Sequence, residues 1–398
     1  MQKKLIVVAL AAAFTLPTAA HADNGNFTFY GVADLSYDFV NTGDGTSAAV
    51  TATNPTGTSA VSGISKRVVS SNVSKFGFKG SEDLGEGLSA NWQIEQQIDI
   101  DAAAKNTFAS RNTFINVKSE KLGAVLFGIH DTPYKIAVRK LDMFGDNIGD
   151  NRALMGAPKS VTAVAVTATA GAAPFAGASS QGFELRPTNI LMYTSPTFAG
   201  FNAAVAAVNL TEQNYVNTNK RNNLLSFAVM YDVAPFFGSV AHEAHKLESN
   251  VTTTQGQDES ATRLGFGFKP EGKPFEVTAV YEKTTDNLGL LGANVNGHSA
   301  AYLGAKYMMG SNAVKLGYGK AGTLGTGTAQ IADSGASQVT VGYDHGLSKR
   351  TKLYAIYTKI TNGKGINYGF SQSSGAATTN SGFGTSPSVV SLGVKHSF

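Results

Sequence analysis

Cysteine is absent from this 398-residue chain, which excludes a disulfide framework, thiol chemistry and zinc-thiolate sites. Long hydrophobic runs are also absent after Leu16, where none approaches the roughly 20 residues that a membrane-spanning helix needs. The charge balance is small, with 32 basic and 28 acidic residues, so the composition predicts no nucleic-acid-binding surface. Stability must come from the fold itself, and any membrane span must be a strand.

The amino terminus has the three parts of a secretory signal peptide. Residues 1–4 are basic, residues 5–16 are apolar but too short to span a bilayer as a helix, and Ala20–Ala22 fits an A-x-A cleavage site. We expect residues 1–22 to be removed and residues 23–398 to form one domain. Losing Lys3 and Lys4 would leave 30 basic residues, still close to neutral.

The carboxy terminus ends in the middle of an alternating segment. The residues on its apolar face are Val390, Leu392, Val394 and Phe398, with His396 as a polar interruption. A strand without a capping loop leaves a sticky edge unless it pairs with another strand. Closure of the sheet into a barrel satisfies that edge.

The same alternation recurs along the whole chain. A strand that faces lipid on one side and water on the other needs only about 10 residues. The sixteen predicted strands span residues 26–40, 75–79, 88–101, 109–118, 123–131, 187–194, 199–210, 223–233, 236–247, 260–269, 275–284, 298–309, 311–321, 337–346, 350–361 and 387–398. Short turns and long loops alternate between them, which predicts an all-β transmembrane antiparallel β-barrel of 16 strands. Residues 41–70 are interpreted as one long loop.

The connection over residues 132–186 is out of scale, because loops of more than 50 residues need a function or are disordered. We expect this third external loop to fold inward and narrow the lumen. Its charged half is the candidate constriction, with Asp131, Asp142, Asp146, Asp150, Lys135, Arg139, Lys140 and Arg152. Its second half, residues 161–180, is nearly uncharged.

Several segments, in order along the chain, resemble those of general porins of the neisserial and Burkholderia type. They are residues 74–88, 92–96, 111–115, 131–133, 193–201, 347–355 and 392–398. The resemblance implies a trimeric outer-membrane porin with basic residues on the wall and acidic residues opposite or on the loop. By matching motif positions it implies wall roles for Lys75, Glu95 and Arg111, with Asp131 at the mouth of the loop. Asp142 and Asp146 complete the predicted constriction.

Each of these residues also has a structural interpretation. Lys75 could be a solvated lumen side chain, Glu95 and Arg111 could form a wall pair, and loop aspartates could serve solubility alone. Two departures from the family pattern stand out: Ile129 where an Arg is common, and Asn116-Val117 in place of Gly-Leu. The loss of a wall cation at Ile129 argues against strong anion preference.

Aromatic residues are interpreted as interfacial belts. They are Phe76, Phe78, Trp92, Tyr193 and Tyr354. No catalytic, cofactor or metal site is predicted. His242 and His245, three apart on a predicted strand, point to opposite faces and cannot share a metal, and no G-x-S-x-G elbow occurs.

The sequence therefore predicts a general diffusion channel for passive transport of ions and small hydrophilic solutes across a Gram-negative outer membrane. Expected partners are two further copies of the chain, outer-membrane lipid and lipopolysaccharide, and the barrel-assembly machinery, whose signal the ending at Phe398 resembles. The alternatives are a plugged, adhesive or structural barrel, and a barrel enzyme such as an outer-membrane phospholipase.

Overall fold

The computed structural model describes residues 26–47, 56–101, 108–156, 183–209, 223–246, 258–285, 297–325, 330, 332–370, 376 and 382–398. The predicted signal peptide, residues 1–22, lies outside this part of the chain. So do residues 157–182, which contain most of the uncharged half of the long loop.

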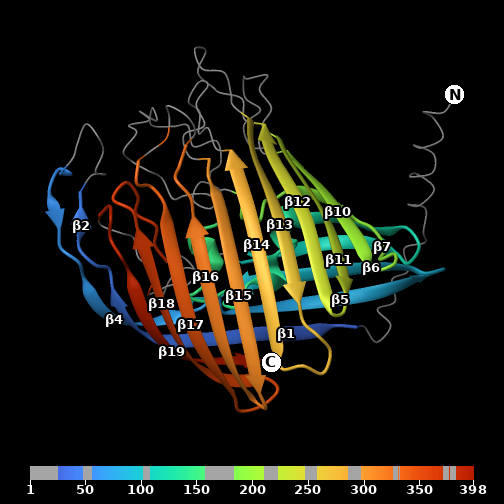
Figure 1. The fold of residues 1–398 in the computed structure, drawn as a ribbon. Helices are drawn as coiled ribbons and strands as arrows, with labels where there is room; N and C mark the ends of the chain where they lie inside the picture. The colour runs from blue at the N-terminus through green and yellow to red at the C-terminus, as the bar shows by residue number, and fades with distance from the viewer. Residues whose placement is uncertain are drawn as a thin grey trace.

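Seventeen strands in the described ranges form one antiparallel sheet, seen from the side in Figure 1. The sheet closes because β1 (Thr28–Asn41) pairs with β19 (Ser388–Ser397), with Leu35 opposite Val394. The strands β4 (Ser65–Ser71) and β5 (Lys75–Gly85) pair with successive halves of β1, so they act as one interrupted strand. The fold is a closed barrel of sixteen strands, as the alternation predicts.

The other barrel strands each pair with their neighbours in the chain. They are β6 (Leu88–Gln97), β7 (Thr113–Ser119), β8 (Gly123–Ile129), β9 (Ile190–Thr194), β10 (Phe201–Asn209), β11 (Asn223–Val233), β12 (Phe236–Lys246), β13 (Asp258–Phe268), β14 (Phe275–Thr285), β15 (Ser299–Met309), β16 (Asn312–Ala321), β17 (Ala336–Gly346) and β18 (Thr351–Asn362). A small separate sheet joins β2 (Gly45–Thr46) and β3 (Ala60–Val61). Short helical turns follow β8, namely α2 (Pro133–Ile136), η1 (Arg139–Leu141) and η2 (Asn151–Ala153).

Side chains alternate between the two faces of the wall. On β18, Leu353 and Tyr357 are each 44% exposed, whereas Tyr354 and Ile356 are buried. Because successive residues of a strand point to opposite faces, the exposed apolar set lies outside and the buried set faces the interior. Among the described residues, no helix has the length and apolar character to cross a membrane.

The structure corrects two predictions. Residues 41–70 are not one loop, because β4 occupies Ser65–Ser71. Charged residues on both faces of this strand, Lys66 inward and Arg67 outward, hide the apolar alternation. The strand then breaks before β5, where Val73 has a φ of 52°. Tyr354 does not belong to an outer aromatic belt, because it faces inward and its hydroxyl donates to Asp34 Oδ1 at 2.7 Å.

Candidate functional site

The long loop leaves and re-enters the wall through one cluster of charges. Thr132 caps α2 by accepting from the backbone N–H of Lys135. The carboxylate of Asp131 forms ion pairs with Lys135 Nζ at 3.0 Å and with Arg186 at 2.9 Å. Since Arg186 lies at the far end of the loop, Asp131 ties both ends together. Burial favours the neutral acid, but these two cations hold the pKa of Asp131 well below its usual range.

A second buried network fastens the loop to β13 and β14. Arg263 pairs with Glu282 and, at 2.5 Å, with Glu184 near the end of the loop. Glu282 accepts from the hydroxyl of Tyr134 at 2.7 Å and from the backbone N–H of Gly156 at 2.7 Å. The guanidinium of Arg263 also lies 4.3 Å from the centre of the Tyr134 ring. The carboxylate of Glu282 therefore holds Tyr134, near the start of the loop, and Gly156 in place.

Between these anchors, apolar loop side chains fit where the wall carries glycine. A Cβ built on Gly342 would lie 2.6 Å from Cε1 of Phe144, and one on Gly317 would lie 3.1 Å from the same ring. Gly265 receives Leu141 in the same way, at 2.6 Å. These glycines have inward parity on their strands, so residues 138–149 lie against the inner face of the barrel. The Gly-aromatic pairs of the sequence are thus packing positions.

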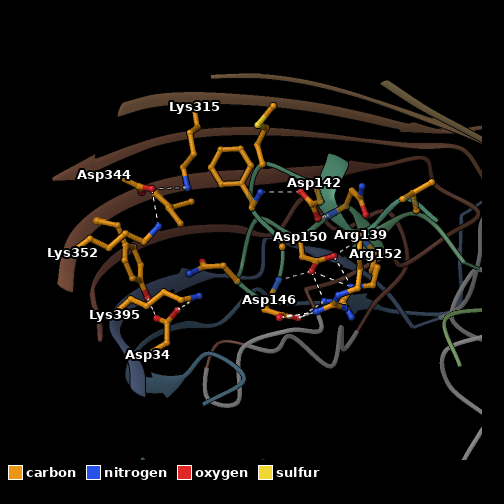
Figure 2. Close-up of a pocket in the computed structure, with 18 of the residues that line it drawn as sticks. Asp34, Arg139, Asp142, Asp146, Asp150, Arg152, Lys315, Asp344, Lys352 and Lys395 are labelled. Carbon is orange, nitrogen blue, oxygen red and sulfur yellow. Dashed lines mark hydrogen bonds and ion pairs between the residues drawn. The ribbon is translucent and has the colours of Figure 1, made fainter. Parts of the chain in front are cut away.

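The segment leaves a cavity of about 240 Å³ between itself and the wall strands β1, β16, β17, β18 and β19. Six cationic and six anionic side chains line it, and Figure 2 shows most of them in two groups. The wall group joins Lys315 and Lys352 to Asp344, at 3.2 and 2.7 Å, and Lys395 to Asp34 at 3.3 Å.

The loop group is paired within itself. Asp146 accepts ion pairs from Arg139 at 2.7 Å and from Arg152 at 2.9 Å, and Arg152 reaches Asp150 at 2.5 Å. Burial acts to raise the pKa of Asp146, but the two guanidinium groups outweigh it and hold the pKa far below its usual range. Asp146 is therefore a permanent negative charge beside the cavity.

Asp142 behaves differently. Its carboxylate accepts backbone hydrogen bonds from Phe144 at 2.9 Å and from Asn151 at 3.0 Å, and it forms no ion pair with any described residue. Burial, then the neighbouring charge of Asp150, raise the pKa of Asp142 to about 7. This carboxyl changes its charge near neutral pH.

The three predicted wall residues lie together. Glu95 pairs with Arg111 at 2.5 Å and accepts from the hydroxyl of Tyr30 at 3.0 Å. Lys75 is within electrostatic range of Arg111, Glu95 and the loop carboxylate of Asp146. Within the described ranges Lys75 makes no ion pair. The fourth predicted residue, Asp131, forms no ion pair with these three; it lies at the root of the loop, where its backbone N–H donates to the side chain of Asn112 at 3.2 Å.

Sequence reasoning missed the lysine group of the wall. Lys315 and Lys352 lie on the inward parity of β16 and β18, beside small residues and next to Tyr354. Their inward parity was the feature of the sequence from which these interior lysines could have been predicted. Conversely, Ile129 shares the outward parity of Val125 and Phe127, so an apolar residue there removes no charge from the interior.

A closed sixteen-stranded barrel with an apolar outside and a charged interior is the architecture of an outer-membrane channel. The sequence matches the family model described as Gram-negative porin over residues 7–365, and the chain belongs to that family. It is a general diffusion channel of the Gram-negative outer membrane.

Similar proteins come from beta-proteobacteria. The chain is 25% identical over 406 residues to outer membrane porin protein 32 of Delftia acidovorans, with all of both chains covered. It is 27% identical over 378 residues to major outer membrane protein P.IB of Neisseria meningitidis serogroup B, covering 92% of this chain and 95% of the relative. The solved anion-selective porin from Comamonas acidovorans shares the fold, with a TM-score of 0.66, 22% identity and coverage of 94% and 100%. The predicted family resemblance is confirmed.

Proposed function

We propose that solutes pass through a constriction between the loop segment 139–152 and the charged wall. The observation that carries this proposal is the cavity in Figure 2, with paired charges of the loop on one side and lysines of the wall on the other. Fixed charges on opposite sides of a water-filled passage create a transverse field that orients dipolar solutes and biases ions. Permeation is passive, and no side chain has a chemical role.

The proposed constriction residues have three different roles. Lys75, Glu95 and Arg111 on the wall and Asp146 on the loop supply the field, because they lie within electrostatic range of one another. Asp142 adjusts that field through its protonation. Asp131, buried in its two ion pairs, positions the loop without facing the passage.

We propose a weak anion preference. The cavity is balanced between cations and anions. Lys75, on the wall strand β5, has no counter-ion within ion-pair distance among the described residues, and burial together with the charge of Asp150 raises the pKa of Asp142 to about 7. The relative from Comamonas is an anion-selective porin, which supports the same direction. Exposed charges are screened beyond about 8–10 Å at physiological salt, so only residues near the narrowest point contribute strongly.

The test is single-channel recording of the refolded residues 23–398 in a planar bilayer under a salt gradient. We expect large, long-lived conductance steps and a reversal potential slightly on the anion side. Neutralising Lys75 and Arg111 together should move the reversal potential toward cations. An unchanged potential would remove both residues from the constriction, and inserted protein without conductance would show a plugged barrel.

We further propose that three copies associate through an outer aromatic cluster where the ends of the barrel wall meet. The centre of the Phe29 ring lies 5.3 Å from that of Phe78 and 5.6 Å from that of Phe398. The cluster also contains Phe27, Phe76 and Trp92. Phe27 is 59% exposed and Phe29 is 50% exposed, so the cluster is open to a partner or lipid. The cluster includes Phe398, through which we also propose recognition by the barrel-assembly machinery. The trimer is tested by native gel electrophoresis of a Phe29→Ser variant, which should migrate faster than the unchanged chain.

Contact with lipopolysaccharide is supported by a repeated pattern on the outer face. Exposed lysines follow exposed tyrosines by two residues at the loop ends of β14, β16 and β18. The pairs are Tyr281 and Lys283, Tyr318 and Lys320, and Tyr357 and Lys359. Residues two apart on a strand share a face, so the cations lie about 6.6 Å beyond an aromatic belt. Lipid phosphates would lie at this level of the outer face. The proposal is tested by the amount of lipopolysaccharide that a variant with all three lysines changed to glutamine retains, which should fall.

A further inference from the structure

Asp38 on β1 is a buried acid. Its exposed fraction is 0%, and neither carboxylate oxygen has a hydrogen-bond partner among the residues that the structure describes. It forms no ion pair with a described residue. Asp34, four positions earlier on the same inward face, is by contrast paired with Lys395 at 3.3 Å.

Serine hydroxyls surround Asp38 on the inner wall. Ser391 of β19 lies directly opposite Asp38, and Ser36 is the next inward residue of β1. Ser70 of β4 lies opposite Ser36, which makes it a diagonal neighbour of Asp38. Directly opposite side chains have Cβ atoms about 4.5–5.5 Å apart, and diagonal ones about 7–8 Å. Ser70 and Ser391 are also fully buried, and within the described part of the chain their hydroxyls have no hydrogen-bond partner.

Lys66 of β4 is the other diagonal neighbour of Asp38, but no ion pair joins these two side chains, and the remaining neighbours are apolar. Val68 lies opposite Asp38 on β4, and Val40 is the next inward residue of β1. Val40 belongs to a buried cluster with Phe144 and Ile148 of the loop, and Val68 packs against that cluster. A carboxylate excluded from water in such surroundings is strongly disfavoured unless a cation or hydrogen-bond donors compensate it.

We propose that Asp38, Ser70 and Ser391, with Ser36, bind a hard monovalent cation such as Na⁺ at the seam of β1, β4 and β19. Carboxylate and hydroxyl oxygens are the ligands that hard cations prefer. The site contains a single carboxylate, and one positive charge matches its negative charge, which favours a monovalent over a divalent ion. The site has a single acidic residue, so it differs from the groups of three or more His, Cys, Asp or Glu side chains that are absent from the described ranges.

This site goes beyond permeation. It lies where β4 is interrupted before β5 and where the loop tip packs on the closing strands of the barrel. A bound ion would fix this seam without taking part in the constriction, so its failure would leave the channel function untouched.

The experiment uses the whole refolded chain in detergent. Thermal unfolding is compared in NaCl, CaCl₂ and N-methylglucamine chloride at equal ionic strength, and crystals soaked in RbCl are examined for anomalous scattering. We expect a higher melting temperature in Na⁺ and a Rb⁺ peak among Asp38, Ser70 and Ser391. Asp38→Asn should abolish the peak and the difference between Na⁺ and N-methylglucamine. Asp34→Asn, a paired acid on the same face, is the matched control and should keep both.

Ser391→Ala keeps the carboxylate and guards against a general folding defect in the Asp38 variant. It should weaken the apparent Na⁺ affinity about tenfold, as expected for the loss of one polar ligand. Equal melting in Na⁺ and N-methylglucamine, a water molecule in place of Rb⁺, or Lys66 turned onto Asp38 would overturn the proposal. A larger stabilisation by Ca²⁺ than by Na⁺ would overturn the charge-matching argument.

Discussion

The loop segment from Thr132 to Gly156 meets the barrel wall differently on its two sides. Toward β11–β17 it is in contact with the wall, through the carboxylate of Glu282 and through apolar side chains against wall glycines. Toward β1, β18 and β19, together with Lys315 of β16 and Asp344 of β17, a cavity separates the charged groups. There the loop cations pair with loop acids, and the wall cations pair with wall acids.

The same residue types therefore have two uses. A pair such as Arg263 and Glu184, whose side chains are 1% and 6% exposed, links the wall to the loop and is removed from water. Such a pair positions the loop, and its charges cancel locally. Pairs that stay within one side of the cavity, such as Arg139 and Asp146, leave the two sides free to face each other across water. Ion pairs between the loop and the wall position the loop, whereas charges that stay on opposite sides of the cavity supply the proposed transverse field.

Breaking the contact side should have the largest effect. Glu282→Ala leaves Arg263 buried with half its charge partners and removes the two hydrogen bonds that Glu282 accepts from the loop. Breaking a buried ion pair by removing one partner is worth about 3–5 kcal/mol. We expect a loss of that size in denaturant unfolding, with unstable and larger conductance steps.

The matched control is Glu276→Ala. Glu276 pairs with Lys306 at 3.9 Å, and both side chains are partly exposed at 22% and 28%. Exposed pairs are worth less than about 1 kcal/mol. Equal destabilisation by the two variants would show that the buried network does not hold the loop.

Removing an apolar contact should have a somewhat smaller effect. Phe144→Ala empties the space against Gly317 and Gly342, and a large-to-small change of this kind costs about 3 kcal/mol at the lower end of its range. Because Phe144 borders the cavity, the loop tip should also move more freely. Current noise in the open channel should increase, whereas Leu347→Ala, an exposed residue of a short turn, should change neither quantity.

The sequence predicted the barrel well because its signal is local. Each strand alternates over about ten residues, so strand number, order and outward face follow from parity alone. The interruption at Val73 and the strand before it escaped this reasoning, because β4 carries charges on both faces. A strand of this kind has no alternation of apolar and polar residues from which it could be predicted.

The site was predictable only in part. Lys75, Glu95 and Arg111 could be placed together from their motifs, and their proximity to Asp146 needed the loop to be folded. The lysines of β16, β18 and β19 are far apart in sequence, and only strand register brings Lys352 opposite Lys395. Likewise, the difference between buried Asp131 and half-protonated Asp142 depends on partners that lie up to 55 residues away.

Substitutions on the side of the loop that faces the cavity should change the ion preference of the channel. Lys75→Gln should shift the reversal potential toward cations, because it removes the wall cation that faces Asp146 without an ion pair of its own. Lys352→Gln removes the same charge but should shift it less. Lys352 is 36% exposed, so water and salt screen it, and Asp344 stays paired with Lys315. A larger shift from Lys352 would place the narrowest point near β18.

The smallest expected effect is a dependence on pH. Asp142 has a pKa near 7 in the folded protein and 3.8 in the unfolded chain, so the folded state binds its proton more tightly. The contribution of this proton to stability is complete below about pH 3.8 and is lost as pH rises through about 7. Over the same range the loop gains one negative charge. Anion preference should therefore decrease between pH 6 and pH 8, measured by reversal potential, and Asp142→Asn should remove the slope. A slope that persists in this variant would assign the titration to another group, such as His130. It would also mean that Asp142 keeps a fixed charge, which would make the loop side of the cavity as constant as its wall side.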